Sequence, residues 1–238
     1  MVETNQFKLP LVDAAQAQKH VTVNEALARL DTAAQLRLVS ISETVPPTTA
    51  TDGEAYFVPT CAVNAWDGHS DEVAIFANEG WVFLAPKIGW RAWIEDITEN
   101  AMFDGLIWRE GAVALSTGGA VTMFKLVEFD HVITPGPYND TLVEIEDAMV
   151  VHGVSARVLT DITGSGLTSW KLGVDGATAR FGSGFSLSAG ASVAGVAAKP
   201  QAYWGGDPIR LGAEGGDFID GTVRLVIHGM KIEEPRSD

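Results

Sequence analysis

The spacing of apolar residues divides the chain into three zones, and the first of them, residues 1–44, carries nearly all of the helical signal. Asp13 followed by Gln16 fits a capping box, and Asn24 is a second residue suited to begin a helix. The β-branched run 20–23 predicts an extended link between these two helices. The second helix is expected to carry one apolar face, formed by Leu27, Leu30, Ala34 and Leu38.

The second zone, residues 52–110, consists of short apolar runs separated by turn residues, which is typical of an antiparallel unit of hairpins. Asp-Gly turns are expected at 67–68 and 104–105, and a third turn at 78–80. Five of the seven tryptophans fall in this zone, so it reads as a small tryptophan-rich domain. Its predicted strands are 54–58, 72–77, 81–84, 91–94 and 101–103.

The third zone begins after a glycine-rich stretch, residues 111–124, which is expected to be a linker. From 125 to 238 the predicted strands are longer, and 142–146 and 223–228 are the clearest of them. Fourteen glycines between 164 and 221 favour many tight turns. The sequence therefore predicts a mainly β chain: a short N-terminal helical segment, a hairpin domain and a C-terminal β-sandwich or jelly roll.

Charge and composition exclude several classes of partner. The formal net charge of −15 is spread over both halves of the chain, so no basic patch is available for nucleic acid or for an anionic membrane surface. No run of 18 apolar residues predicts a membrane-spanning helix, and the N-terminus does not resemble a signal peptide, so we expect synthesis in the cytoplasm. Cys61 is the single cysteine and is expected to be a buried thiol.

Catalytic patterns are scarce, and we expect neither an enzyme nor a bound metal or cofactor. The chain contains no nucleophile elbow and no phosphate-binding loop, and its five histidines are isolated from one another. Acidic residues crowd two stretches, and these are expected to be solvated turns, with a calcium site as the alternative. They are Asp67, Asp71 and Glu72 in one stretch, and Asp207, Glu214, Asp217 and Asp220 in the other.

The aromatic residues are the most informative candidates for ligand contact. Aromatic faces stack on sugar rings, although a small hairpin domain also needs large side chains to fill its core. Trp81 and Trp90 each follow a glycine, which leaves the backbone bare beside the ring. In the last zone a predicted loop places two aromatic residues close to an acidic and a basic residue. The candidate saccharide contacts are therefore Tyr203, Trp204, Asp207, Arg210, Trp81 and Trp90.

The N-terminal run Ala14–Leu27, AAQAQKHVTVNEAL, resembles the signature of a domain family of unknown function that occurs in tailed phages, prophages and gene transfer agents. Later residues match the same pattern, and the resemblance covers residues 9–110. These residues are Asp52–Tyr56, Gly80–Trp81, Pro86, Gly89–Trp90 and Phe103–Gly105 with Trp108.

The resemblance implies a non-catalytic fibre or head-spike subunit, and the family defines no catalytic residues. Such a subunit would be made in the bacterial cytoplasm and reside on the particle surface, outside the cell after lysis. Its implied partners are two further copies in a homotrimer, other virion proteins, and host capsule or lipopolysaccharide glycan. Assembly and attachment are expected to involve Gln16, Gln18, Lys19, His20, Asn24, Glu25, Leu27 and Leu30. Two alternatives stay open: a polysaccharide depolymerase or esterase using carboxylates such as Asp207 and Asp217, and a purely structural virion connector.

Overall fold

A computed structural model describes residues 3–12 and 19–237, and the chain forms two compact units, Met1–Val121 and Thr122–Asp238. Strands dominate both units, and the helical signal is confined to the N-terminal zone, so the expected fold class is confirmed. The helix and the tryptophan-rich hairpins belong to the same unit.

In the described part of the N-terminal zone, residues 20–23 lie inside a helix, α1 (Lys19–Ala34), instead of forming an extended link between two helices. The prediction for residues 20–23 was wrong because the helix penalty of a β-branched residue is only about 0.7 kcal/mol at most, which the helix formers that follow offset. The expected helix start at Asp13 lies outside the described residues. Asn24 lies inside α1, and its side chain instead accepts a hydrogen bond from the Val12 N–H at 2.9 Å and donates to the Val12 carbonyl at 3.1 Å.

The Asp31 carboxylate determines which face of α1 is buried, because it binds the N-terminal segment. Asp31 accepts hydrogen bonds from the Thr4 hydroxyl at 2.7 Å and from the backbone N–H groups of Gln6 and Phe7, both at 2.8 Å. Burial opposes ionisation of Asp31, but these hydrogen bonds outweigh it and lower its pKa. Because Asp31 points inward, Leu30 is left 57% exposed, so the predicted apolar face is not the buried one.

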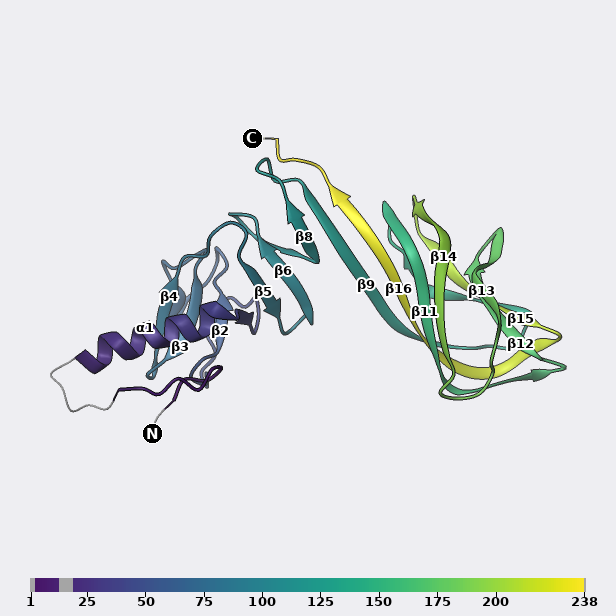
Figure 1. Ribbon diagram of the computed structural model, residues 1–238, viewed down its shortest axis with the longest axis horizontal. Helices are drawn as coiled ribbons and strands as arrows, with labels where there is room; N and C mark the ends of the chain where they lie inside the picture. Colours follow the sequence, from purple (N-terminus) through teal and green to yellow (C-terminus); the bar gives the residue numbers. More distant parts are fainter. Residues whose placement is uncertain (1–2, 13–18, 238) are drawn as a thin grey trace. The chain divides into compact units, whose positions relative to one another are not determined.

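Seven strands of the first unit, β1 to β7, form two small sheets. One has the order β2-β3-β4, and α1 packs against β3 and β4 (Figure 1). The other has the order β1-β5-β6-β7, in which β1 pairs parallel to β5. The five strands predicted from the hairpin pattern are all present. The bounds are β1 (Arg37–Leu38), β2 (Ala55–Phe57), β3 (Val73–Ala77), β4 (Gly80–Leu84), β5 (Arg91–Ile94), β6 (Glu99–Phe103), β7 (Trp108–Glu110) and β8 (Ala112–Leu115), with a 3₁₀ turn η1 (Asn64–Trp66).

Turn chemistry explains the hairpins. Asn78 and Glu79 connect β3 to β4 with φ of +52° and +62°, as a two-residue type I′ turn requires. The Asp-Gly turn between β6 and β7 is held by Asp104, whose carboxylate accepts from the N–H groups of Leu106 and Ile107, both at 2.9 Å. Gly105 follows at φ +102°, a conformation open mainly to glycine.

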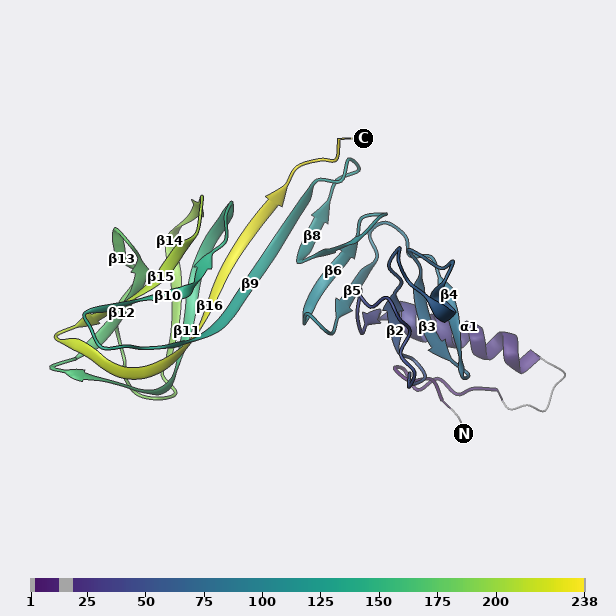
Figure 2. The ribbon, with the colours of Figure 1, turned by 180° about the vertical axis from the view of Figure 1, so that it is seen from behind.

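The second unit is a sandwich of two antiparallel sheets, as predicted (Figures 1 and 2). One sheet has the order β10-β15-β12-β13, and the other contains β14-β11-β16-β9 in that order. The strand bounds are β9 (Val121–Val132), β10 (Tyr138–Ile145), β11 (Met149–Ser165), β12 (Ser169–Val174), β13 (Ala177–Phe185), β14 (Ser192–Tyr203), β15 (Asp207–Glu214) and β16 (Asp217–Glu233).

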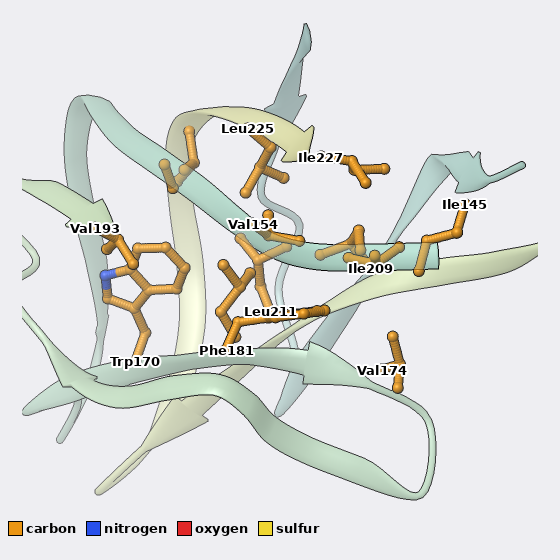
Figure 3. Packing of buried hydrophobic residues seen from close by; sticks show 14 of the residues in the cluster. Ile145, Val154, Trp170, Val174, Phe181, Val193, Ile209, Leu211, Leu225 and Ile227 are labelled. Carbon is orange, nitrogen blue, oxygen red and sulfur yellow. The ribbon is translucent and has the colours of Figure 1, made fainter. Parts of the chain in front are cut away.

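The core of the second unit lies between its two sheets. Figure 3 shows Val154 and Leu225 from one sheet directed toward Leu211 from the other. Trp170 is fully buried there, and its indole N–H donates to the Ser186 carbonyl at 3.0 Å, so burying this large ring leaves no polar atom unpaired.

Two further expectations differ from the structure. Residues 111–124, expected to be a linker, include β8 and the first residues of β9. Cys61 is exposed, not buried, because it occupies the turn that follows β2, where the Ala62 N–H bonds to the Pro59 carbonyl.

Candidate functional site

Pairing of β10 with β15 brings a charged and aromatic group together on one face of the second unit. Asp140 lies directly opposite Arg210 in this antiparallel ladder, and Tyr138 lies opposite Gly212. Residues two apart on a strand share a face, so Tyr138 and Asp140 project to the same side as Arg210. Asn139 and Thr141, the residues on either side of Asp140, are buried, which places the shared face toward solvent.

Arg210 is the centre of this group. Its Nε and one terminal nitrogen donate to the two carboxylate oxygens of Asp140 at 2.6 and 2.7 Å, and the other terminal nitrogen donates to Asp175 at 2.5 Å. The guanidinium carbon lies 4.3 Å from the centre of the Tyr138 ring, within cation–π distance. The planar guanidinium of Arg210 is held in one orientation, because it pairs with the Asp140 carboxylate and stacks on the Tyr138 ring. The group is therefore preorganised.

A cavity of about 510 Å³ lies beside this group, between β9 and β10. Tyr138 and Asp140 contribute to its lining, together with His131, Thr134 and Asn139. Asn139 is fixed by Thr134: its side-chain oxygen accepts from the Thr134 N–H at 2.7 Å and its amide donates to the Thr134 carbonyl at 2.9 Å. The volume is within the range of small-ligand sites.

The charge states of the site follow from these contacts. The hydrogen bonds and charge of Arg210 lower the pKa of Asp140, so the carboxylate is ionised at neutral pH. Burial lowers the pKa of His131 and outweighs the opposing effects of Asn139 and Asp140, which keeps the imidazole neutral near pH 7. Nε2 of His131 is buried and has no hydrogen-bond partner among the described residues. The site therefore offers an anion, a cation and a neutral imidazole within one surface region.

The four candidates proposed from the predicted loop do not form one cluster. Trp204 is 77% exposed, whereas Tyr203 is only 4% exposed and belongs to the core. Asp207 pairs with Ile145 at the start of β15, and Arg210 is three residues later, so the two project to opposite faces of the strand. Of these residues, only Arg210 lies in the group with Tyr138.

Trp81 and Trp90 belong to the first unit and pack within it. Trp81 contacts Trp66 edge to face with ring centres 5.2 Å apart, and it makes similar contacts with Tyr56 and Phe76. Trp90 is half-buried and packs against the core shared by the two small sheets. Both rings therefore have the packing role that was the alternative to sugar contact.

The residues expected to mediate assembly are only partly described. Gln16 and Gln18 lie outside the described residues, and Lys19 and His20 begin α1. Asn24 holds the Val12 backbone, and Glu25 pairs with Arg29 at 2.7 Å, one helical turn away. Leu27 is half-buried and Leu30 is exposed. The apolar stripe that these two residues form on α1 is therefore open to solvent in a single chain.

Glu214, from the second acidic stretch, has hydrogen-bond partners within the second unit. Glu214 accepts from the Ser169 hydroxyl at 2.7 Å and from the Gly184 N–H at 2.9 Å. Within residues 3–12 and 19–237, no group of three or more His, Cys, Asp and Glu side chains is arranged to hold a metal ion. In the same ranges, no helix combines the length and the apolar character needed to cross a membrane.

The sequence pattern did not reveal Tyr138, Asp140, Asp175 and His131. The only local signal is the run Pro135-Gly136-Pro137, a turn that presents an aromatic and an acidic residue immediately after it. Joining Asp140 to Arg210 requires the β10–β15 register, which spans 70 residues of sequence.

Part of the chain is similar to a known protein family and to a solved structure. Residues 23–109 match a family described as "Protein of unknown function (DUF2793)". A structure titled "Cyanophage Pam1 capsid asymmetric unit" matches with a TM-score of 0.32 and 18% sequence identity, covering 47% of this chain and 84% of that chain. No curated protein matches.

Proposed function

We propose that the chain is a structural subunit of a tailed-phage or gene transfer agent particle that binds a host surface polysaccharide without cleaving it. The particle assignment is supported by the N-terminal pattern, whose region overlaps the family match at residues 23–109. The binding assignment is supported by the group around Arg210 in the second unit. The family match at residues 23–109 also includes the hairpins whose tryptophans build the core of the first unit.

The arrangement of Tyr138 over Arg210 is the observation that carries the binding proposal. Tyr138 remains 52% exposed although the guanidinium lies against its ring, so part of the ring is free to contact the apolar face of a sugar. Asp140 keeps unused lone pairs and Arg210 keeps two of its five N–H donors, which suit sugar hydroxyls. Because these groups are already fixed, binding costs little side-chain ordering.

The adjoining cavity extends the same chemistry. Thr134 and Asn139 line it, and His131 adds a neutral imidazole. A site of about 510 Å³ accommodates a short oligosaccharide segment better than a single ion. Polar groups of both donor and acceptor type beside an exposed ring distinguish this surface from a simple charged patch.

Assembly is proposed to use the solvent-facing stripe of α1. Val23, Leu27 and Leu30 are spaced by four and then three residues, as in a coiled-coil seam, and Val23 and Leu30 are exposed. A homotrimer would bury this stripe against its copies. Light scattering of the full chain tests this: we expect a trimer mass that Leu30→Glu reduces, while Leu106→Glu, at an exposed leucine in the β6–β7 turn, leaves it unchanged.

A glycan array tests the proposed function. The full chain should bind a restricted set of bacterial capsular or lipopolysaccharide glycans, and Tyr138→Ala should weaken that binding about thirtyfold, the effect of losing a contact worth about 2 kcal/mol. Arg157→Lys is the matched control, since Arg157 is an exposed arginine of the other sheet whose side chain donates a hydrogen bond to the Gly190 carbonyl. Absence of binding to every surface glycan would leave a virion connector as the better account.

A further inference from the structure

A second group of polar side chains lies on the outer face of the other sheet of the second unit, where β11 is irregular. Val151 pairs with Gly229 of β16, and Gly153 pairs with the adjacent His228, so His152 is an extra residue without a partner in that ladder. The register with β14 shifts at the same place. A β-bulge redirects side chains, and bulges are frequent beside active sites.

The hydroxyl of Ser155 and the imidazole of His228 meet next to this bulge. Ser155 Oγ lies 2.8 Å from Nε2 of His228, on the adjacent strand β16. Both residues are partly buried, and both project away from the core that Val154 and Ile227 help to form. A serine hydroxyl within hydrogen-bond reach of an imidazole nitrogen is the arrangement that produces an activated nucleophile.

His152 supplies an unused donor at the same place. Its Nε2 is buried and has no hydrogen-bond partner among the described residues, while the ring contacts Phe124 edge-on at 6.2 Å between ring centres. Leaving a buried polar atom unpaired costs free energy, which a ligand oxygen accepting from it would recover. With the ring proton on Nε2, His152 would act as a hydrogen-bond donor to an oxygen bound in front of Ser155.

These three side chains line one shallow groove of about 320 Å³. The rest of the lining is small and apolar: Gly153, Val154, Ala194, Gly195 and Val196. Such small apolar residues leave room for a short acyl group. None of these residues lines the cavity beside Arg210, so the two sites are independent.

We propose that this groove is an acyl-ester hydrolase site, with Ser155 as nucleophile, His228 as general base and His152 as donor to the oxyanion. Its substrate class is an ester of a short carboxylic acid, such as an acetyl ester of an alcohol. The activity goes beyond the saccharide-binding function and does not depend on it.

The reaction uses only the ester and water. Ser155 Oγ bonds to the carbonyl carbon as its proton passes to His228 Nε2, and the resulting oxyanion accepts a hydrogen bond from His152. The carbonyl then re-forms, the bond to the alcohol oxygen breaks, and the alcohol leaves with the proton from His228. Water attacks the acyl-serine by the same route, which releases the carboxylic acid and restores Ser155.

Hydrolysis of p-nitrophenyl acetate by the full chain tests this site. We expect saturable hydrolysis that Ser155→Ala abolishes, and that His228→Gln and His152→Gln each reduce about a hundredfold in kcat/KM, as for loss of a general base or of one oxyanion donor. p-Nitrophenyl octanoate should react more slowly than the acetate because the groove is shallow. Ser192→Ala is the control, at an exposed serine of β14 in the same sheet.

Covalent labelling gives a second readout that needs no variant. A fluorophosphonate should modify Ser155, located by mass spectrometry of the digested wild-type chain. Hydrolysis equal in the wild type and Ser155→Ala, no hydrolysis by the wild type, or a label on any other residue would each overturn the assignment.

Discussion

Replacing Asp104 by alanine should destabilise the first unit by about 3–5 kcal/mol, the cost of removing one partner from a buried charged network. The Asp104 side chain is only 1% exposed and accepts from two backbone N–H groups in the β6–β7 turn and from Arg109 Nε at 2.7 Å. A hydrogen bond to a charged group contributes about 1.5–3 kcal/mol, so the two backbone bonds account for at least about 3 kcal/mol. Arg109 contributes less, because its side chain is partly exposed and regains water.

The loss of stability expected for Asp104→Ala is larger than that expected for two related substitutions. Asp104→Asn keeps an oxygen for the two backbone donors but turns an amide toward Arg109, so we expect a smaller loss, about 1–2 kcal/mol. Asp96→Ala, at an exposed aspartate of the preceding β5–β6 turn, should change stability by less than about 0.5 kcal/mol.

Guanidinium unfolding followed by tryptophan fluorescence measures these differences. Trp108 lies in the core beside the turn and reports the first unit, and the two units are expected to give separate transitions. The Asp104 carboxylate also predicts that the stability of the first unit depends on pH. Hydrogen bonds hold the Asp104 pKa below its usual value despite burial, so its stabilisation is present above about pH 4 and is lost as pH falls through the folded-state pKa. An Asp104→Ala variant within about 0.5 kcal/mol of the wild type would refute this reasoning.

Three further predictions concern other parts of the molecule. His131→Gln should flatten the fall in thermal stability of the second unit between pH 7 and 5, because a histidine with a lowered pKa favours folding above about pH 6.5 and loses that effect as pH falls; an unchanged slope would contradict the assignment. Gly195→Ala should cost about 1–3 kcal/mol of unfolding free energy, since its new Cβ would lie 2.5 Å from the Phe181 carbonyl oxygen; a neutral result in chemical denaturation would show that the strands can separate there. Asp31→Ala should release the N-terminal segment, which faster hydrogen exchange at the Gln6 and Phe7 amides would reveal; unchanged protection would mean that other contacts hold it.

The elements that could be predicted from sequence are those specified by local chemistry. The turn at Asn78–Glu79 and the strand Arg91–Ile94 depend on nearest-neighbour patterns, and both were predicted correctly, although the type I′ geometry of the turn was not. The helix was misread where local preference and tertiary context disagree, because Asp31 directs the buried face toward the N-terminal segment while Leu30 remains outside. Periodicity correctly identified an apolar stripe, but it does not indicate whether a stripe faces the core or the solvent.

The candidate sites depended on long-range pairing that sequence does not display. Arg210 was proposed as a ligand contact, but its partners were assumed to be its sequence neighbours Trp204 and Asp207, when the ladder instead gives it Asp140 and Tyr138. Likewise, His152 and His228 appeared isolated because 76 residues separate them, although β11 and β16 are adjacent strands. A bulge of one residue in β11 is also invisible in the alternation of polar and apolar positions.

Isothermal titration of the full chain with the strongest glycan from the array is the most direct test of the binding account. The Arg210→Lys variant keeps the charge but loses the planar guanidinium that pairs with Asp140 and stacks on Tyr138, so its affinity should fall about 10- to 150-fold, as expected for losing about 1.5–3 kcal/mol. Arg157→Lys should bind like the wild type. Equal affinity of the wild type and Arg210→Lys would contradict the account and place the glycan elsewhere on the chain.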